Sequence, residues 1–146
     1  MSKSVPLRHD YAYFVPITTR WHDNDFYGHV NNVTYYSYID TVANHFLIHQ
    51  GELDIRNSDI IGVVVGSSCD YFSSVAYPDE LQGGLRVAKI GNSSVTYQVG
   101  IFKDGSEQAA AAGSFTHVFV TRENQRPTAI PSAIRKALET LLVANA

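Results

Sequence analysis

The segment RWHDNDFYGHVNNVTYYSYID, residues 20–40, gathers several side chains that can do chemistry. Asp23 and Asp25 lie between two histidines, His22 and His29. A carboxylate can act as a general base or as a nucleophile, and an imidazole can carry a proton. Folding gains little from crowding titratable groups in this way. The segment is therefore the first candidate for a functional site.

A long helix is predicted directly after these residues. From Val33 onward, apolar residues recur at helical spacing. The residues of this face are Tyr36, Ile39, Ala43, Phe46 and Leu47, widened by Tyr35, Val42 and Ile48. We therefore predict a largely buried helix from about Asn32 to Gln50. Asn31 or Asn32 can cap its N-terminus, and Gly51 is placed to end it in a left-handed conformation.

The chemistry is expected at the corner where a strand meets this helix. We predict that a strand covers residues 11–21 and that His22, Asp23 and Asp25 lie at its end. Gly28 then lets the chain turn sharply or lets a ligand approach the backbone. A helix N-terminus presents unpaired N–H groups and a positive dipole end, which can hold an anion or a developing oxyanion. A carboxylate beside those donors could act as a base or as a nucleophile.

The rest of the chain is predicted to be mostly β-structure. One side of the first strand is formed by Tyr11, Tyr13, Val15, Ile17, Thr19 and Trp21. Pro16 cannot donate to a ladder, which favours an edge position or a bulge. The apolar run IIGVVVG, residues 60–66, is typical of a buried strand and extends through residue 75. Further strands are predicted at 81–90, 95–102 and 109–122, with turns at 91–92 and 103–105.

The order of these elements predicts the fold class. A short helix is expected at the end, over residues 130–143, with Pro131 near its start. We therefore predict an α+β fold in which an antiparallel sheet wraps around one long central helix, in a single domain over residues 1–146. The small residues from Ala109 to Gly113 would let that helix lie close to the sheet.

Length and composition limit the classes of function. The chain has 146 residues and a formal net charge of −3 with no basic block, so neither nucleic acid nor an anionic membrane surface is an expected partner. Its one cysteine, Cys69, excludes an internal disulfide and a cysteine-rich zinc site. No run approaches the roughly 18 apolar residues of a membrane span, and residues 1–11 hold no apolar signal core. We therefore expect a soluble cytoplasmic protein.

The pattern D-N-D-x-x-G-H-V-N-N-x-x-Y-x-x-Y-x-D, which starts at Asp23, resembles the signature of the 4-hydroxybenzoyl-CoA thioesterase family. Members of that family are hotdog-fold acyl-CoA thioesterases, and the resemblance covers nearly the whole chain. It implies that Asp25 is the catalytic carboxylate, which attacks the thioester carbonyl or activates a water. It also implies that the backbone N–H of Asn32 polarises the carbonyl and that Gly28 is the turn glycine. His29 would hydrogen-bond Asp25 or the substrate.

The same resemblance implies how the substrate is held. Asn31, Ser93 and Ser94 are the candidate substrate-binding residues, although the asparagine is first a helix cap and the serines first a hairpin turn. Charge alone offers four candidates for the phosphates of the coenzyme, namely Arg86, Lys89, Arg122 and Arg126. No metal and no cofactor are expected, because coenzyme A is part of the substrate. The expected assembly is a homodimer joined edge to edge with the site at the interface, or a tetramer or hexamer.

Several alternatives remain open at this point. Asp23 is expected to hold the turn, and His22 to be exposed or structural. Asp40 falls where relatives carry a helix glutamate, but the arginine that often follows is absent. A metal-dependent hydrolase could use His22, Asp23, Asp25 and His29 as ligands. Successive residues of a strand face opposite ways, however, so His22 cannot easily join Asp23 and Asp25 on one ion. Two other hypotheses are a 3-hydroxyacyl-thioester dehydratase that uses His29 with Asp25, and a non-catalytic acyl-CoA binding protein. The acyl group, and coenzyme A versus a carrier protein, stay undecided.

Overall fold

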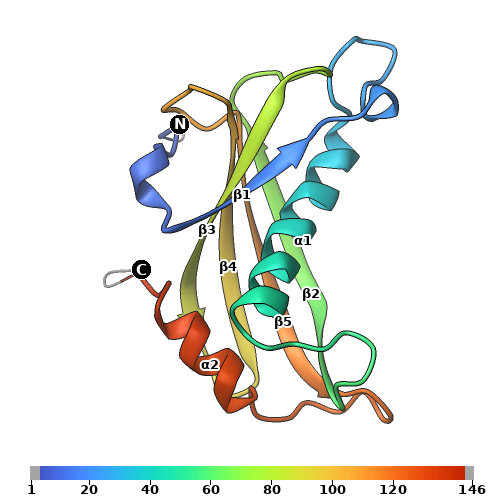
Figure 1. Cartoon of the computed structure of the whole chain (residues 1–146), viewed down its shortest axis with the longest axis vertical. Helices are drawn as coiled ribbons and strands as arrows, with labels where there is room; N and C mark the ends of the chain where they lie inside the picture. Colours follow the sequence, from blue (N-terminus) through green and yellow to red (C-terminus); the bar gives the residue numbers. More distant parts are fainter. Residues whose placement is uncertain (1–3, 144–146) are drawn as a thin grey trace.

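One antiparallel sheet carries a long helix across one face. The computed structural model describes residues 4–143. The strands are β1 (Tyr13–Thr18), β2 (Ile60–Tyr71), β3 (Glu80–Ile90), β4 (Ser94–Lys103) and β5 (Ala111–Thr121), and the helices are α1 (Asn32–His49) and α2 (Ser132–Glu139). Two short 3-10 turns, η1 (Arg8–Asp10) and η2 (Trp21–Asp23), precede and follow β1. The strand order is β1-β3-β4-β5-β2, and the sheet curves around α1 (Figure 1). The predicted α+β arrangement of a sheet around one helix is confirmed.

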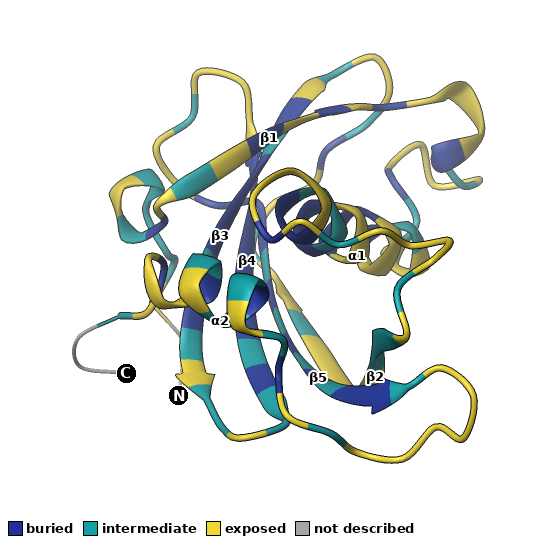
Figure 2. Cartoon of the chain, turned by 60° about the horizontal axis from the view of Figure 1, so that its bottom comes forward, coloured by how far each residue is buried: buried dark blue, intermediate teal, exposed yellow. Residues whose placement is uncertain are grey.

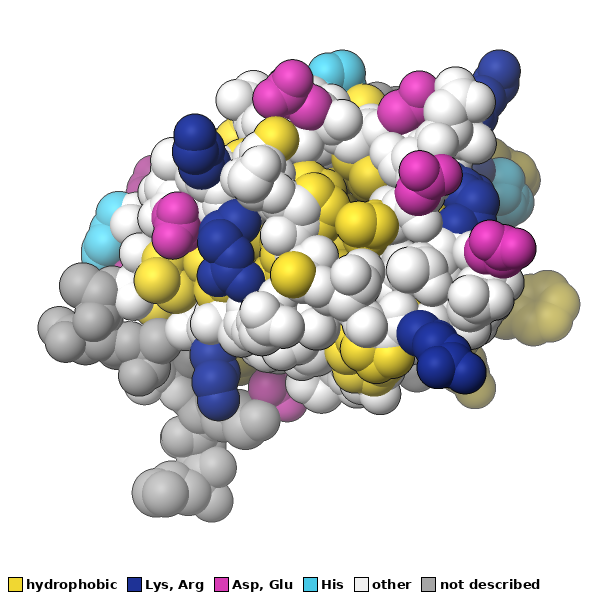
Figure 3. All heavy atoms as spheres, turned by 90° about the horizontal axis from the view of Figure 1, so that it is seen from below, with side chains coloured by type: hydrophobic (Ala, Val, Ile, Leu, Met, Phe, Trp, Pro, Cys, Tyr) yellow, Lys and Arg dark blue, Asp and Glu magenta, His cyan; other side chains and the backbone are white. Residues whose placement is uncertain are grey.

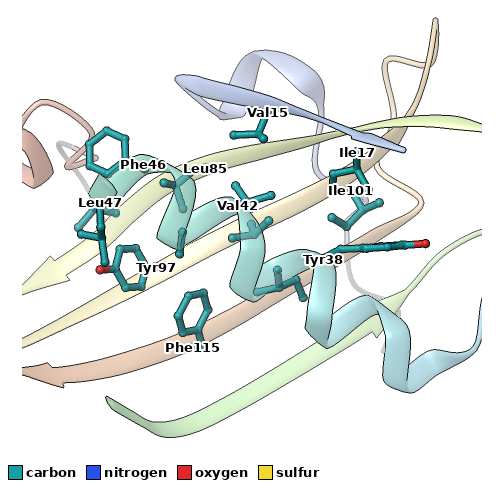
Figure 4. Packing of buried hydrophobic residues seen from close by; sticks show 14 of the residues in the cluster. Val15, Ile17, Tyr38, Val42, Phe46, Leu47, Leu85, Tyr97, Ile101 and Phe115 are labelled. Carbon is teal, nitrogen blue, oxygen red and sulfur yellow. The ribbon is translucent and has the colours of Figure 1, made fainter. Parts of the chain in front are cut away.

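The core lies between α1 and the sheet. Seven residues of α1 are buried, namely Tyr35, Tyr38, Ile39, Val42, Ala43, Phe46 and Leu47. They meet apolar side chains of β1 and of the central strands, among them Leu85, Tyr97 and Phe115 (Figure 4). Ile134 and Leu138 of α2 belong to the same cluster, so both helices cover one face of the sheet.

Missing side chains beneath α1 let the helix lie close to the sheet. A Cβ added at Gly113 of β5 would collide with Cδ1 of Ile39, and one added at Gly83 of β3 would collide with Cγ2 of Val42. The small residues around Gly113 were predicted to serve this purpose, and the contact with Ile39 confirms it. Burial of the helix face is worth roughly 25 cal/mol for each Å² of apolar surface, so this close contact stabilises the position of α1.

Two expectations about α1 were wrong in part. Tyr36 and Ile48 remain 39% and 38% exposed, because the sheet of one chain covers only one side of the helix. Gly51 does not adopt the left-handed conformation; Glu52 does, with φ of 60°. A Cβ on Gly51 would lie 2.7 Å from the carbonyl oxygen of Leu47. The glycine is therefore explained by close packing against the last helical turn.

The two edge strands each differ from the prediction: β1 is shorter than expected, and β2 is less buried. Pro16 lies in β1, which is an edge strand, as predicted. This strand ends at Thr18, so the predicted extension to residue 21 was wrong, and Trp21 is 79% exposed. The run at 60–66 forms part of β2, but that strand lies at the other edge and was wrongly predicted to be buried (Figure 2). Val65, beside a bulge in the pairing with β5, is 61% exposed.

The other elements lie close to their predicted bounds. The tight turn at 91–92 closes through a 2.7 Å hydrogen bond from the Gly91 N–H to the Ser94 oxygen. Gly105, in the turn at 103–105, has φ of 82°. α2 is shorter than the predicted 130–143, because the chain leaves the helix after Glu139 and bridges to β3.

The close contact of α1 with the sheet can be tested by adding one carbon atom. We expect Gly113→Ala to lower the free energy of unfolding by about 1–3 kcal/mol, because the new Cβ overpacks against Ile39. In an Ile39→Val background, which lacks the colliding Cδ1, the same change should cost less. Urea denaturation of the four proteins measures this coupling. Equal costs in both backgrounds would contradict the proposed contact.

Candidate active site

A buried carboxylate fixes the loop that precedes α1. Asp23 is 1% exposed, and its Oδ2 accepts hydrogen bonds from the Tyr38 hydroxyl at 2.7 Å and from the Arg20 N–H at 2.9 Å. The Arg20 guanidinium pairs with Oδ1 at 3.0 Å. Burial raises the pKa of Asp23, but the hydrogen bonds from Tyr38 and Arg20 outweigh it and hold the pKa below its ordinary value. The structural role expected for Asp23 is thus supported by every contact of its side chain.

The backbone around Asp23 corrects one detail of the predicted corner. His22 and Asp23 lie in the 3-10 turn η2 and not at the end of a strand. The carbonyl oxygen of Asp23 accepts from the Asn31 N–H at 2.9 Å, which ties this turn to the start of α1. The turn replaces the strand because Asp23 bonds back to the Arg20 N–H, which ends the extended conformation.

Asp25 lies at the beginning of a second tight turn. Its N–H donates to the His29 oxygen and its oxygen accepts from the Gly28 N–H, both at 3.0 Å. Gly28 has φ of 83°, a conformation that glycine adopts without strain, so its predicted role as the turn glycine is explained. One carboxylate oxygen of Asp25 accepts from the Tyr27 N–H at 2.9 Å. The half-buried carboxylate is thereby oriented by the loop without being enclosed.

The first turn of α1 lies beside Asp25. Asn31 is the N-cap, since its Oδ1 accepts from the Val33 N–H at 2.9 Å. Its side-chain amide donates to Oδ2 of Asp25 at 3.4 Å, so one residue both caps the helix and contacts the carboxylate. Asn32 is the first helical residue. Its N–H is one of the first four N–H groups of the helix, which have no hydrogen-bond acceptor within the helix. His29 is exposed, and its bond to Asp25 runs from the Asp25 N–H to the His29 backbone oxygen, not through the imidazole.

Two pockets open on this corner. Asp25 and Gly28 line one of about 640 Å³, together with Trp21, His22, Asn24 and Phe26. His29 and Asn32 line another of about 340 Å³, which Tyr35 and Tyr71 also border. The loop carries aromatic side chains that face solvent, since Phe26 and Tyr27 are exposed almost completely. The corner therefore offers a carboxylate, a helix N-terminus and apolar surface in one place.

Ser93 and Ser94 are not brought to this corner within one chain. Ser94 begins β4 and pairs with Val118 near the end of β5, whereas Ala111 at the start of β5 pairs with Tyr71. The Tyr71 hydroxyl donates to the backbone oxygen of Asn32, so Tyr71 and Ala111 lie at the end of the sheet that is beside the Asp25 corner. The two serines thus lie at the opposite end of the sheet.

The basic candidates for phosphate binding separate into two groups. Arg86 is engaged with Gln98 and stacks on Tyr11, and Arg122 donates to the Ser58 and Ile55 oxygens. These two arginines hold the structure together. Lys89 and Arg126 show no such side-chain contacts among residues 4–143 and remain candidates. The end of the molecule seen in Figure 3 mixes basic and acidic side chains and has no extended surface of one sign.

Within residues 4–143, no three side chains of His, Cys, Asp or Glu are gathered as a metal site. None of the helices in this part of the chain has the length and apolar character needed to cross a bilayer.

Comparison with known proteins identifies the family. Residues 19–138 match the Thioesterase-like superfamily, and this span includes the whole corner and both helices up to Leu138. The chain belongs to that superfamily. The crystal structure of the PA5185 protein from Pseudomonas aeruginosa strain PAO1 is similar to this chain with a TM-score of 0.96 and 55% identity, over 98% of this chain and 100% of the other.

Two other proteins are similar to this chain at lower identity. The PA2801 protein from Pseudomonas aeruginosa, which carries a provisional thioesterase assignment, has a TM-score of 0.80 and 27% identity over 86% of this chain and 96% of its own. The uncharacterized protein YsmA of Bacillus subtilis (strain 168) is 28% identical over 86 residues, which is 59% of this chain. That match spans only 58% of the length of YsmA.

Two features of the Asp25 corner were not predicted from the sequence. One is the hydrogen bond from the Tyr38 hydroxyl to Asp23. The signal was present, because both residues belong to the motif that carries the resemblance. The other is the exposure of Trp21, Phe26 and Tyr27, since aromatic residues are ordinarily expected in the core.

The Asp23 contact predicts a measurable loss of stability. Tyr38→Phe removes one donor from a buried carboxylate, so we expect the free energy of unfolding to fall by about 1–3 kcal/mol. Tyr36→Phe, a change at an exposed tyrosine of the same helix, is the matched control and should stay within about 0.5 kcal/mol of wild type. Denaturant titration followed by circular dichroism compares them. Equal effects of the two changes would show that Asp23 does not depend on Tyr38.

Proposed function

We propose that this protein is an acyl-CoA thioesterase of the 4-hydroxybenzoyl-CoA thioesterase type, which hydrolyses an acyl-CoA to a free acid and coenzyme A. Membership of the Thioesterase-like superfamily supports thioester hydrolysis as the class of reaction. The observation that carries the proposal is the position of Asp25, half-buried and in contact with the N-cap of α1. The reaction needs no metal and no cofactor, because coenzyme A belongs to the substrate.

The proposed mechanism assigns one role to each residue of the corner. Asp25 takes a proton from a water as the water oxygen bonds to the thioester carbon, or it attacks that carbon itself. The backbone N–H of Asn32 donates to the carbonyl oxygen as negative charge develops there, and the positive end of the α1 dipole adds to this effect. The carbon–sulfur bond then breaks and the coenzyme leaves as a thiolate, which takes up a proton. In the nucleophilic route, water hydrolyses the resulting anhydride.

The neighbouring residues would orient this reaction. Asn31 holds Oδ2 of Asp25 through its side-chain amide, so it can keep the carboxylate directed toward the substrate. Gly28 leaves room above the turn, since a Cβ there would meet no atom within 4 Å. His29 borders the pocket that contains Asn32, where it would hydrogen-bond the substrate.

A second copy of the chain would complete the site. The edge of β2 away from β5 has no strand partner among the described residues, and Val64 and Val65 are 50% and 61% exposed there. An apolar edge strand of this length is a surface on which another strand can pair. Ser93 and Ser94 lie at the opposite end of the sheet from Asp25 of their own chain, so in this proposal they contact a substrate held at the site of another copy. The proposed assembly is a dimer through β2, which could associate further into a tetramer or hexamer.

The central prediction concerns Asp25. We expect Asp25→Asn to lower kcat for thiol release from acyl-CoA by at least about a hundredfold, because the amide can neither accept the proton nor attack the carbonyl. EDTA should leave the wild-type rate unchanged. A colour reagent for free thiols, applied to a panel of acyl-CoAs, measures both effects and begins to define the acyl group. His22→Asn, at an exposed histidine of the same pocket, is the comparison for non-specific damage to the loop.

The alternatives would give different results in the same assay. Full activity in Asp25→Asn would contradict the role of Asp25, and loss of activity in EDTA would favour a metal-dependent hydrolase. Release of water from a 3-hydroxyacyl thioester without thiol would favour the dehydratase reading. Tight binding of acyl-CoA with no turnover would favour a binding protein.

The proposed dimer generates a separate prediction. Val65→Asp places a charge in the centre of the β2 edge, so we expect the mass in solution to fall from dimer to monomer and thiol release to fall at least about tenfold. Ile55→Asp, a comparable change at an exposed loop residue, is the control and should alter neither. Light scattering coupled to size-exclusion chromatography measures the mass. An active monomer would contradict the view that the site needs a second copy.

A further inference from the structure

A second cluster of chemically capable side chains lies at the other end of α1. His45 and His49 are separated by one helical turn, and their ring centroids lie 4.2 Å apart with the ring planes tilted by 37°. Nδ1 of His45 is hydrogen-bonded to the Tyr13 hydroxyl of β1 at 2.9 Å. His45 lies thirteen residues beyond Asn32, which is about 20 Å along a helix, so this cluster is separate from the Asp25 corner.

The two imidazoles have the spacing of a helical chelate. Histidines at positions i and i+4 project from one face of a helix, which is how zinc proteins with two histidines on one helix hold their metal. The contact with Tyr13 supplies the outer support that metal-bound histidines ordinarily have. When Nδ1 of His45 donates its proton to the Tyr13 oxygen, the lone pair for a metal is on Nε2.

The surroundings are compatible with a bound cation at this place. His49 lies in the last turn of α1, where the helix dipole is negative. His45 is half-buried and His49 is exposed, which leaves solvent access to the pair.

We propose that His45 and His49 form a binding site for a divalent transition-metal ion of the zinc or copper class. Each imidazole provides one nitrogen, and water fills the remaining coordination positions, because no third His, Cys, Asp or Glu joins the pair within residues 4–143. Imidazole ligands suit Zn²⁺ and Cu²⁺ and do not suit Mg²⁺ or Ca²⁺. The site does not depend on the proposed thioesterase reaction.

The test uses the untagged full-length protein and Cu²⁺ or Zn²⁺ alone. We expect one Cu²⁺ per chain, with hyperfine structure from two imidazole nitrogens in the electron paramagnetic resonance spectrum. Isothermal titration with Zn²⁺ should show that His45→Asn and His49→Asn each raise Kd at least about tenfold. His9→Asn, at an exposed histidine that pairs with Asp10, is the matched control and should leave Kd unchanged.

A third variant examines the role of Tyr13. Tyr13→Phe keeps the ring but loses the hydroxyl, and we expect it to raise Kd about tenfold, as the loss of an outer hydrogen bond does at other metal sites. Circular dichroism establishes that each variant is folded before titration. A wild-type Kd equal to that of His49→Asn, or a copper spectrum with a single imidazole nitrogen, would overturn the proposal.

Discussion

The position of α1 depends on the absence of side chains beneath it. Gly113 and Gly83 lie under Ile39 and Val42, and neither position has room for a Cβ. Any larger residue there would lift the helix, and the dispersion contacts of the whole buried face would weaken together. The N-terminus of α1 would move with it. The position of the N–H that we propose to meet the thioester carbonyl therefore depends on two glycines in the sheet.

Asp23 and Asp25 show how two carboxylates close in sequence acquire different uses. Asp23 is buried and receives hydrogen bonds from Tyr38 and from the backbone and guanidinium of Arg20. A carboxylate so fully engaged has no lone pair directed toward a ligand, and its burial is tolerated because these donors compensate for lost water. Asp25 receives fewer bonds and borders a pocket. The first holds the loop in place, and the second is the one that we propose takes part in the reaction.

The sequence predicted the features that follow from local chemistry. Pro16 lacks a donor and lies on an edge, Asn31 caps α1, and the strands from 81 to 122 lie within a few residues of their predicted bounds. Features that depend on distant contacts were not predicted. Gly51 was explained by conformation, whereas packing against Leu47 excludes a larger residue. Nothing in the pattern of residues 11–21 indicated that Asp23 would bond back to Arg20 and end the strand at Thr18.

The remaining wrong predictions all expected more burial than one chain provides. The run at 60–66 was predicted to be a buried strand and Tyr36 part of the buried helix face. In one chain residues 60–63 are only half-buried, and residues 64–66 and Tyr36 are exposed. Tyr36 and Val64 border the same pocket between α1 and β2, so the uncovered apolar surface is continuous there. A soluble chain rarely exposes such a surface without a partner that covers it. The pattern of β2 is thus explained if its hydrophobic residues pack against a second copy, and the Asp25 corner, with its exposed aromatic residues, would then face that same partner.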